Sequence, residues 1–283
     1  MGALVGSACG WVGTYLLLRR MALIGDAISH SVLPGIVGAF FLTRHTSTAA
    51  MFAGAIAAGF ATVALVEFIQ KKSRIKADAA ICVVFTTLFA LGVLMVQSLN
   101  THLDVDCVLF GEIAFVPLEP PAMLWGHALG PPSVVRMAAL AAVLLGLIVF
   151  FYKELLITSF DAGISKAMGL SPGAWHYGLM AALSLAVVSS FESVGAIMAV
   201  AMLIVPAMFG AQLSSRLPWR LALSSAHAAA SSVLGFHLAV WLNCSTAGAM
   251  VVAGSFLFLC AWGGTALAQR WHRAKATSHA MRT

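Results

Sequence analysis

The chain is 283 residues long, with 61% hydrophobic residues, only 9% charged residues and a mean hydropathy of +0.96. Soluble domains carry about 25% charged residues, so this chain lacks the polar side chains that a water-facing surface requires. The composition therefore excludes a soluble globular protein and a disordered one.

Nine apolar runs along the chain are long enough to cross a bilayer. The hydrocarbon core is about 30 Å thick, and about 20 apolar residues in a helix span it. Continuous apolar runs, in place of short alternating strands, favour helices over a barrel. The sequence therefore predicts an all-α, polytopic membrane protein with about nine transmembrane helices (eight to ten) in a single domain, residues 1–283. The expected spans are 2–18, 22–42, 48–69, 79–98, 137–152, 174–190, 193–210, 221–242 and 246–268.

The basic residues follow the alternation of these spans. If residue 1 lies outside, fourteen of the sixteen Lys and Arg residues fall on one side, and only Arg44 and Arg136 on the other. Lys and Arg are enriched in cytoplasmic loops, so this side is expected to be the cytoplasm and to hold the C-terminus. The net charge of +6 thus orients the protein and needs no nucleic acid to explain it. The fourteen are Arg19, Arg20, Lys71, Lys72, Arg74, Lys76, Lys153, Lys166, Arg216, Arg220, Arg270, Arg273, Lys275 and Arg282.

The longest polar stretch lies outside in this topology, at residues 99–136. It carries five prolines, which forbid a continuous helix. We expect an irregular external cap there, with one short amphipathic piece around residues 108–113.

A second polar stretch, residues 153–172, lies on the cytoplasmic side. Asp161 can cap a short helix that ends at Gly169, as helix start and stop signals require. Ile164 and Met168 would give this helix an apolar stripe. A simple linker would need none of these features, so the pattern favours a docking segment.

Ionisable side chains are scarce within the expected spans. Asp, Glu, Lys and Arg are represented there by Asp26 and Glu67 alone, and Glu67 lies in the last turn before a basic loop, where it can reach water. An ionisable residue deep in a membrane span marks a functional site by default, which singles out Asp26. His30 follows four residues later, on the same helical face. Pro34 extends this face, and because proline has no N–H it leaves the carbonyl of His30 free and favours a kink.

A carboxylate beside an imidazole suits Mn²⁺, Zn²⁺ or Fe²⁺, and the lack of nearby thiolates argues against Cu⁺. Two ligands are too few for such an ion, so others must come from another helix, the backbone or water. His227 and His237 are weaker candidates, because a lone membrane histidine usually forms an interhelical hydrogen bond. An Asp–His pair that only packs helices stays open as the alternative.

Motifs for enzymatic chemistry do not occur in the sequence. It contains no HExxH, no GxSG and no GxxxxGK[ST], so we expect neither a protease site nor an ATPase site of its own. Any ATP hydrolysis would belong to a separate partner chain.

Five blocks of the sequence carry a resemblance to a known family. The blocks are GTYLLLRRMALIGDAISHSVLPG (13–35), VFTTLFALGVLM (84–95), DVDCVLFGEI (104–113), KELLITSFDAGISKAMGL (153–170) and FESVGAIMAVAMLIVPA (191–207). They resemble the membrane permeases of ATP-binding-cassette (ABC) importers for manganese, zinc and iron. The resemblance implies that Asp26 and His30 coordinate the translocating metal and that residues 153–170 dock into the ATPase subunit. In that segment lie Asp161, Ile164, Lys166, Met168 and Gly169. His227 and His237 depart from the family pattern.

The resemblance implies an ATP-driven importer of divalent metal, with manganese first and zinc or iron as alternatives. Its expected partners are cytoplasmic ATPase subunits, a second permease chain in a homodimer or heterodimer, an external metal-binding protein and membrane lipid. No permanently bound cofactor is expected, and the expected location is the bacterial inner (plasma) membrane. Two other functions stay open: a proton-coupled secondary metal transporter that uses Asp26 as a relay, and a non-transporting scaffold.

Overall fold

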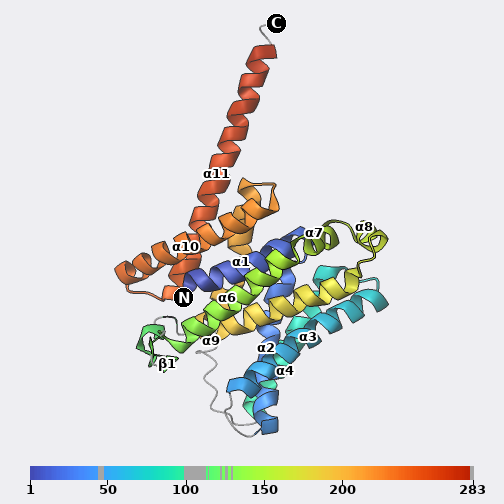
Figure 1. Ribbon diagram of the computed structural model, residues 1–283, viewed down its shortest axis with the longest axis vertical. Helices are drawn as coiled ribbons and strands as arrows, with labels where there is room; N and C mark the ends of the chain where they lie inside the picture. Colours follow the sequence, from blue (N-terminus) through green and yellow to red (C-terminus); the bar gives the residue numbers. More distant parts are fainter. Residues whose placement is uncertain are drawn as a thin grey trace.

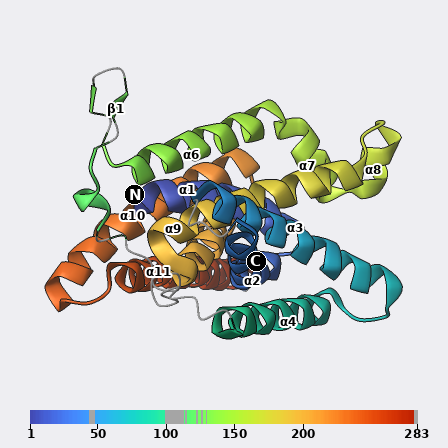
Figure 2. The ribbon, with the colours of Figure 1, turned by 90° about the horizontal axis from the view of Figure 1, so that it is seen from below.

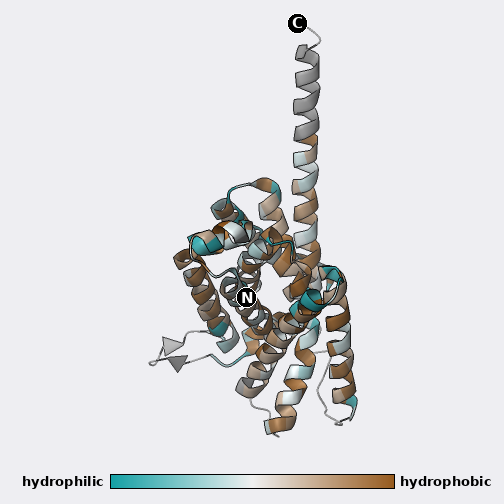
Figure 3. Cartoon of the chain, turned by 90° about the vertical axis from the view of Figure 1, so that its right-hand side faces the viewer, coloured by the Kyte–Doolittle hydropathy of each residue, from teal (hydrophilic) through white to brown (hydrophobic). Residues whose placement is uncertain are grey.

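The computed structural model describes residues 1–43, 48–98, 113, 115–121, 123–124, 127–128 and 130–280. Within this part the chain is built from helices, whose residues are mostly apolar along their length (Figures 1 and 3). The strands β1 and β2 have two residues each and pair antiparallel, Met123 with Ala128 and Leu124 with His127. The elements are α1 (Gly2–Leu18), α2 (Leu23–Thr43), α3 (Thr48–Lys72), α4 (Ala77–Ser98), the 3-10 helix η1 (Val116–Leu118), β1 (Met123–Leu124), β2 (His127–Ala128), α6 (Pro132–Phe150), α7 (Tyr152–Phe160), α8 (Ala162–Ala167), α9 (Pro172–Leu213), α10 (Leu217–Leu242) and α11 (Thr246–Ala280).

The nine expected spans each correspond to an apolar helical segment of the described chain. Seven segments are long and apolar enough to cross a membrane, and Gly2–Leu18 and Ile197–Leu213 are shorter apolar helices. The prediction of an all-helical membrane protein is therefore confirmed, apart from the two short strands.

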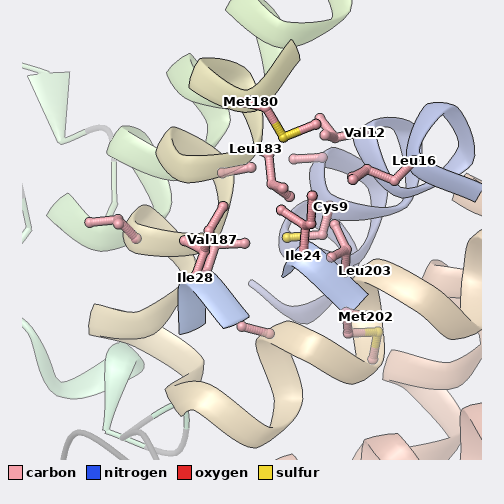
Figure 4. Packing of buried hydrophobic residues seen from close by; sticks show 14 of the residues in the cluster. Cys9, Val12, Leu16, Ile24, Ile28, Met180, Leu183, Val187, Met202 and Leu203 are labelled. Atoms are coloured by element: carbon pink, nitrogen blue, oxygen red, sulfur yellow. The ribbon is translucent and has the colours of Figure 1, made fainter. Parts of the chain in front are cut away.

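Two of the expected spans lie within α9, which folds back on itself. Gly195 interrupts the helix with φ 74° and ψ 170°. Both Leu183 and Leu203 approach Gly25 of α2, although twenty residues of straight helix rise about 30 Å. Two side chains that far apart could not meet one residue, so the chain must fold back near Gly195. Figure 4 shows both leucines entering one core from the two halves of α9.

The contact between α1 and α10 depends on small residues. Glycines on α1 recur every fourth residue and face Ser or Ala residues of α10 that have the same spacing. A methyl group added to Gly6 would lie 2.7 Å from the Cβ of Ala228, too close for real Cβ atoms. The helices thus approach closely, as small residues allow in lipid. The pairs are Gly2 with Ser232, Gly6 with Ala228 and Gly10 with Ser224.

Helix α2 lies at the centre, between α3, α4 and α9. Its Ile24 and Ile28 are buried in the core with Leu183 and Val187 of α9 (Figure 4). Toward α3, the hydroxyls of Ser31 and Thr62 lie 2.6 Å apart and are both buried. One face of α2 is therefore locked in place, which fixes the direction of the opposite face.

The external cap differs from expectation at its end. Helix α6 begins at Pro132, five residues before the expected span, so Arg136 lies inside the helix. Proline is favoured in the first turn of a helix, and the carboxylate of Glu119 accepts hydrogen bonds from the backbone N–H and the hydroxyl of Ser133. Most of residues 99–131, including all but the last residue of the expected amphipathic piece at 108–113, lie outside the described residues.

The polar stretch after α6 holds two helices where one was expected. Phe151, with φ −102° and ψ 28°, separates α6 from α7, and Asp161 separates α7 from α8. In both Figure 1 and Figure 2, α7, α8 and the last turns of α3 lie at one end of the molecule, opposite β1. This end gathers three of the segments that the charge pattern had assigned to one side of the membrane, namely α7, α8 and the end of α3.

Candidate metal pathway and docking segment

Asp26 and His30 lie one turn apart on the free face of α2, directly beyond the buried Ile24. The Nε2 atom of His30 is 3.5 Å from the Oδ1 atom of Asp26. The two side chains are 33% and 38% exposed for His30 and Asp26 respectively, unlike the buried face of the same helix. The structure therefore brings together the two residues that the sequence predicted as metal ligands.

Their separation is informative about what the pair can do. An N–H···O hydrogen bond normally spans about 2.7–3.2 Å, so this pair is too far apart for a good one. Two donor atoms held roughly 2.1 Å from one ion are roughly 3.0 Å apart at a right angle and roughly 3.4 Å apart at a tetrahedral angle. The observed separation is closer to that of two ligands around one cation.

Helix α4 forms an aromatic wall beside the pair. The rings of Phe85 and Phe89 each lie 5.7 Å from the His30 ring, centroid to centroid. One turn further on, a methyl group added to Gly92 would lie 2.8 Å from the Cδ of Pro34. Helix α2 remains helical through Pro34, and the proline ring seats α4 against the site.

Within the described residues, no third His, Cys, Asp or Glu joins this pair to form a metal-binding group. His227 is buried in α10, where its Nε2 lies 3.0 Å from the carbonyl of Gly254 in α11, and its ring packs on Phe209. His237 is exposed, and its Nδ1 lies 2.8 Å from the carbonyl of Val233. Each weaker candidate thus has a backbone partner, and the structure brings neither together with Asp26 and His30.

Helix α8 has the start and the stop that the sequence predicted. The Asp161 carboxylate accepts hydrogen bonds from the N–H groups of Gly163, at 2.6 Å, and Ile164, at 3.2 Å. At the other end Gly169 adopts φ 78°, which glycine tolerates without strain. The N–H of Leu170 then reaches the carbonyl of Ser165, at 3.0 Å, which satisfies the last turn.

The outer face of this segment is apolar and uncovered in the single chain. Phe160, Ile164 and Met168 are 69%, 55% and 61% exposed, and Lys166 is exposed beside them. Ser165, by contrast, is fully buried against the bundle. A short, capped helix that holds large apolar side chains in water has the character of an interaction surface.

Sequence reasoning missed a second polar group at the same end of the molecule. The Oε2 atom of Glu67 accepts hydrogen bonds from Lys71 Nζ, at 2.7 Å, and from Tyr177 Oη, at 2.6 Å. The Oε1 atom of Glu67 lies 2.8 Å from His176 Nε2, and His176 Nδ1 lies 3.5 Å from an Arg19 nitrogen. These five residues, called here the Glu67 cluster, come from the C-terminal cap of α1, from α3 and from α9. Glu67 and Tyr177 are separated by 110 positions in the sequence, so no local pattern signals their contact.

The model of the ABC 3 transport family matches residues 1–263, which include every expected span except the end of the last. The chain belongs to the ABC 3 transport family. It is 45% identical to the manganese transport system membrane protein MntD of Bacillus subtilis over 91% of this chain and 89% of that one. It is 41% identical to the zinc transport system membrane protein TroD of Treponema pallidum, over 91% and 70%.

A solved structure of PsaBC from Streptococcus pneumoniae in complex with Fab has the same fold. It superposes with a TM-score of 0.77 and 34% identity over 92% of this chain and 88% of that one. Membership of the ABC 3 family confirms the resemblance that the five sequence blocks predicted. It favours a transport subunit over the scaffold and the proton-coupled transporter.

Proposed function

We propose that this chain is the membrane permease of an ATP-driven importer of divalent metal ions, with Mn²⁺ as its principal cargo. The observation that carries the proposal is the Asp26–His30 pair, two ligating side chains held 3.5 Å apart and partly exposed on the central helix. Carboxylate and imidazole together suit Mn²⁺, Fe²⁺ and Zn²⁺. The names of the relatives, manganese for MntD and zinc for TroD, support the same class of cargo.

A second permease chain would complete the coordination of the ion. Two ligands from one chain leave most positions around a divalent cation empty, so water or a facing subunit must supply the rest. The site lies at a partly exposed face beside α4, whose Val83, Leu91 and Leu94 are 55%, 47% and 63% exposed. Another permease or lipid would cover these apolar side chains.

The energy would come from separate cytoplasmic ATPase subunits that bind α8. The exposed Ile164 and Met168, flanked by Lys166, offer an apolar surface with a basic rim. Asp161 and Gly169 set the length of the helix that presents it. In this arrangement the α8 end and the C-terminus face the cytoplasm of a bacterial cell, and an external metal-binding protein delivers the ion over residues 99–136.

Metal uptake by proteoliposomes that contain the whole complex tests this function. Asp26→Ala and His30→Ala should each reduce Mn²⁺ uptake to the background of empty vesicles, because each removes a ligand from a low-dielectric site. Asp78→Ala is the matched control, since Asp78 is an exposed carboxylate at the start of α4 and should tolerate the change. Uptake at the wild-type rate in either ligand variant, with normal assembly, would show that Asp26 and His30 are not the metal ligands.

A further inference from the structure

The Glu67 cluster lies beside the N-terminal end of α2. Three of its members, Glu67, Lys71 and His176, line a cavity of about 200 Å³ together with apolar side chains. Ile24, in the wall of this cavity, is two residues from Asp26. The lining residues are Met21, Ile24, Val63, Val66, Glu67, Gln70, Lys71 and His176. The cluster thus closes the bundle between α3 and α9 at the end of α2 from which a cation held by Asp26 would leave.

The cluster is built to hold itself together and is poorly suited to hold a cation. Both oxygens of Glu67 already have partners, and the side chains of Glu67 and His176 are each only 17% exposed. One carboxylate is matched with two cations, Lys71 and Arg19, so the local charge is positive when His176 is neutral. A divalent ion would have to displace Lys71 and approach Arg19, both of which repel it.

Arg19 connects this cluster to the proposed docking segment. Its Nε donates to the Ser159 hydroxyl and its Nη2 to the Thr158 hydroxyl, both at 3.1 Å, in the last turn of α7. Its Nη1 is the atom that faces His176 Nδ1. A guanidinium can serve three partners at once because its donors form a rigid, planar fork. Burial lowers the pKa of Arg19, yet the group stays protonated at neutral pH.

The contact with Arg19 also sets the tautomer of His176. Because Arg19 can only donate, its contact with Nδ1 favours the His176 tautomer with the proton on Nε2. The Nε2 atom lies 2.8 Å from Glu67 Oε1, a close contact that lacks the alignment of a hydrogen bond. A continuous series of polar contacts then runs from Thr158 and Ser159, three and two residues before the Asp161 cap of α8, through Arg19 and His176 to Glu67 on α3.

We infer that the Glu67 cluster is a latch that closes the cytoplasmic end of the metal path and that Arg19 couples this latch to the ATPase-docking segment. The inference rests on the proposed function, because it needs an ATPase bound at α8. When α7 and α8 shift with the ATPase, Arg19 follows Thr158 and Ser159 and loses His176. Glu67 and His176 then lose their mutual orientation, and α3 and α9 can separate below Ile24. Arg19 and Glu67 are positioning residues in this scheme.

Transport per ATP in reconstituted complexes separates a latch from a merely structural network. Arg19→Gln and Glu67→Gln should keep the ATPase bound and hydrolysing while Mn²⁺ transported per ATP falls at least about fivefold, the lower end of typical coupling effects. The double variant should fall no further than the worse single one, because both act through one chain of contacts. Arg20→Gln and Lys72→Gln, neighbouring exposed cations, are the matched controls and should keep the wild-type ratio.

Several results would overturn the latch. An unchanged ratio in Arg19→Gln would do so, and so would loss of the bound ATPase, which would make the network structural only. Mn²⁺ bound at Glu67 in an Asp26→Asn background would make the cluster a release site instead. Two other results would contradict the proposed function itself. One is an ATPase that stays bound to Met168→Asp, a change on the exposed face of α8. The other is normal Mn²⁺ transport by Asp26→Ala.

Discussion

The protein contains two carboxylate–imidazole pairs whose chemistry is the same and whose surroundings differ. Asp26 and His30 lie on one helix, 3.5 Å apart, with about a third of each side chain exposed. Glu67 and His176 come from α3 and α9, lie 2.8 Å apart and are each 17% exposed. Only the second carboxylate also accepts hydrogen bonds from an ammonium group and a phenol, those of Lys71 and Tyr177.

The difference shows how the same two chemical groups can form a metal-ligand pair in one place and a structural contact between two helices in another. A carboxylate without cationic partners keeps its lone pairs for a metal ion, whereas one bound to Lys71 has already exchanged its hydration for fixed donors. Placement matters as well. A pair on a single helix can stay assembled while its surroundings move, but a pair that joins two helices breaks when they separate.

Metal binding by the purified complex is where the two pairs should differ most. In Mn²⁺ titrations followed by electron paramagnetic resonance, Asp26→Asn should weaken binding by at least about 100-fold. Loss of a hydrogen-bond partner that orients a metal ligand typically costs 10- to 100-fold, and this change removes the charge of a ligand itself. Glu67→Gln should leave the titration unchanged, because its carboxylate already has three partners. We call Asp26–His30 the open pair, because its carboxylate has no cationic partner, and Glu67–His176 the closed pair, because its carboxylate is already bound. Equal losses of Mn²⁺ affinity in the two variants would contradict this distinction.

The sequence predicted the open pair because its information is local. Asp26 and His30 are four residues apart in an apolar run, so helical periodicity alone places them on one face. The same applies to α8, whose cap Asp161 and stop Gly169 lie eight positions apart. The nine spans were also predictable, since each apolar run must bury its length in lipid or protein.

The closed pair could not be predicted in this way. Glu67 and His176 meet because the first half of α9 packs along α3, where Gly59 of α3 faces Ser184 of α9. Arg19 was explained by the charge bias of the loops. The bend at Phe151 and the start of α6 at Pro132 were missed for a related reason. Both depend on partners distant from the boundary or on backbone angles that hydropathy does not encode.

The contact between α2 and α4 offers a smaller effect, confined to the open pair. Gly92→Ala would place a methyl group 2.8 Å from Pro34 Cδ and 3.1 Å from Leu33 Cβ, forcing α4 away from the site. Such overpacking typically costs about 1–3 kcal/mol of stability. We expect a lower melting temperature in detergent and slower Mn²⁺ uptake, with transport per ATP less affected than in Arg19→Gln.

Gly146→Ala is the control for this change. A methyl group on Gly146 of α6 meets nothing within 4 Å among the described residues, so stability should hold or rise slightly. If both alanine variants behave alike, close approach at Pro34 does not shape the site.

Loss of the Asp161 cap of α8 should give the smallest effect, and it should act on the binding of the ATPase to α8. Asp161→Ala removes both hydrogen bonds that start the helix, a loss that typically costs about 0.5–2 kcal/mol. If the ATPase binds α8 only as a helix, its affinity for the permease should fall by about 2- to 30-fold, measured by titration with detergent-solubilised permease. Asp161→Ser should restore most of the affinity, because serine is a comparable cap that carries no charge. Weak binding in both variants would instead indicate that the Asp161 carboxylate contacts the ATPase directly, and unchanged binding in both would mean that helix α8 does not dock.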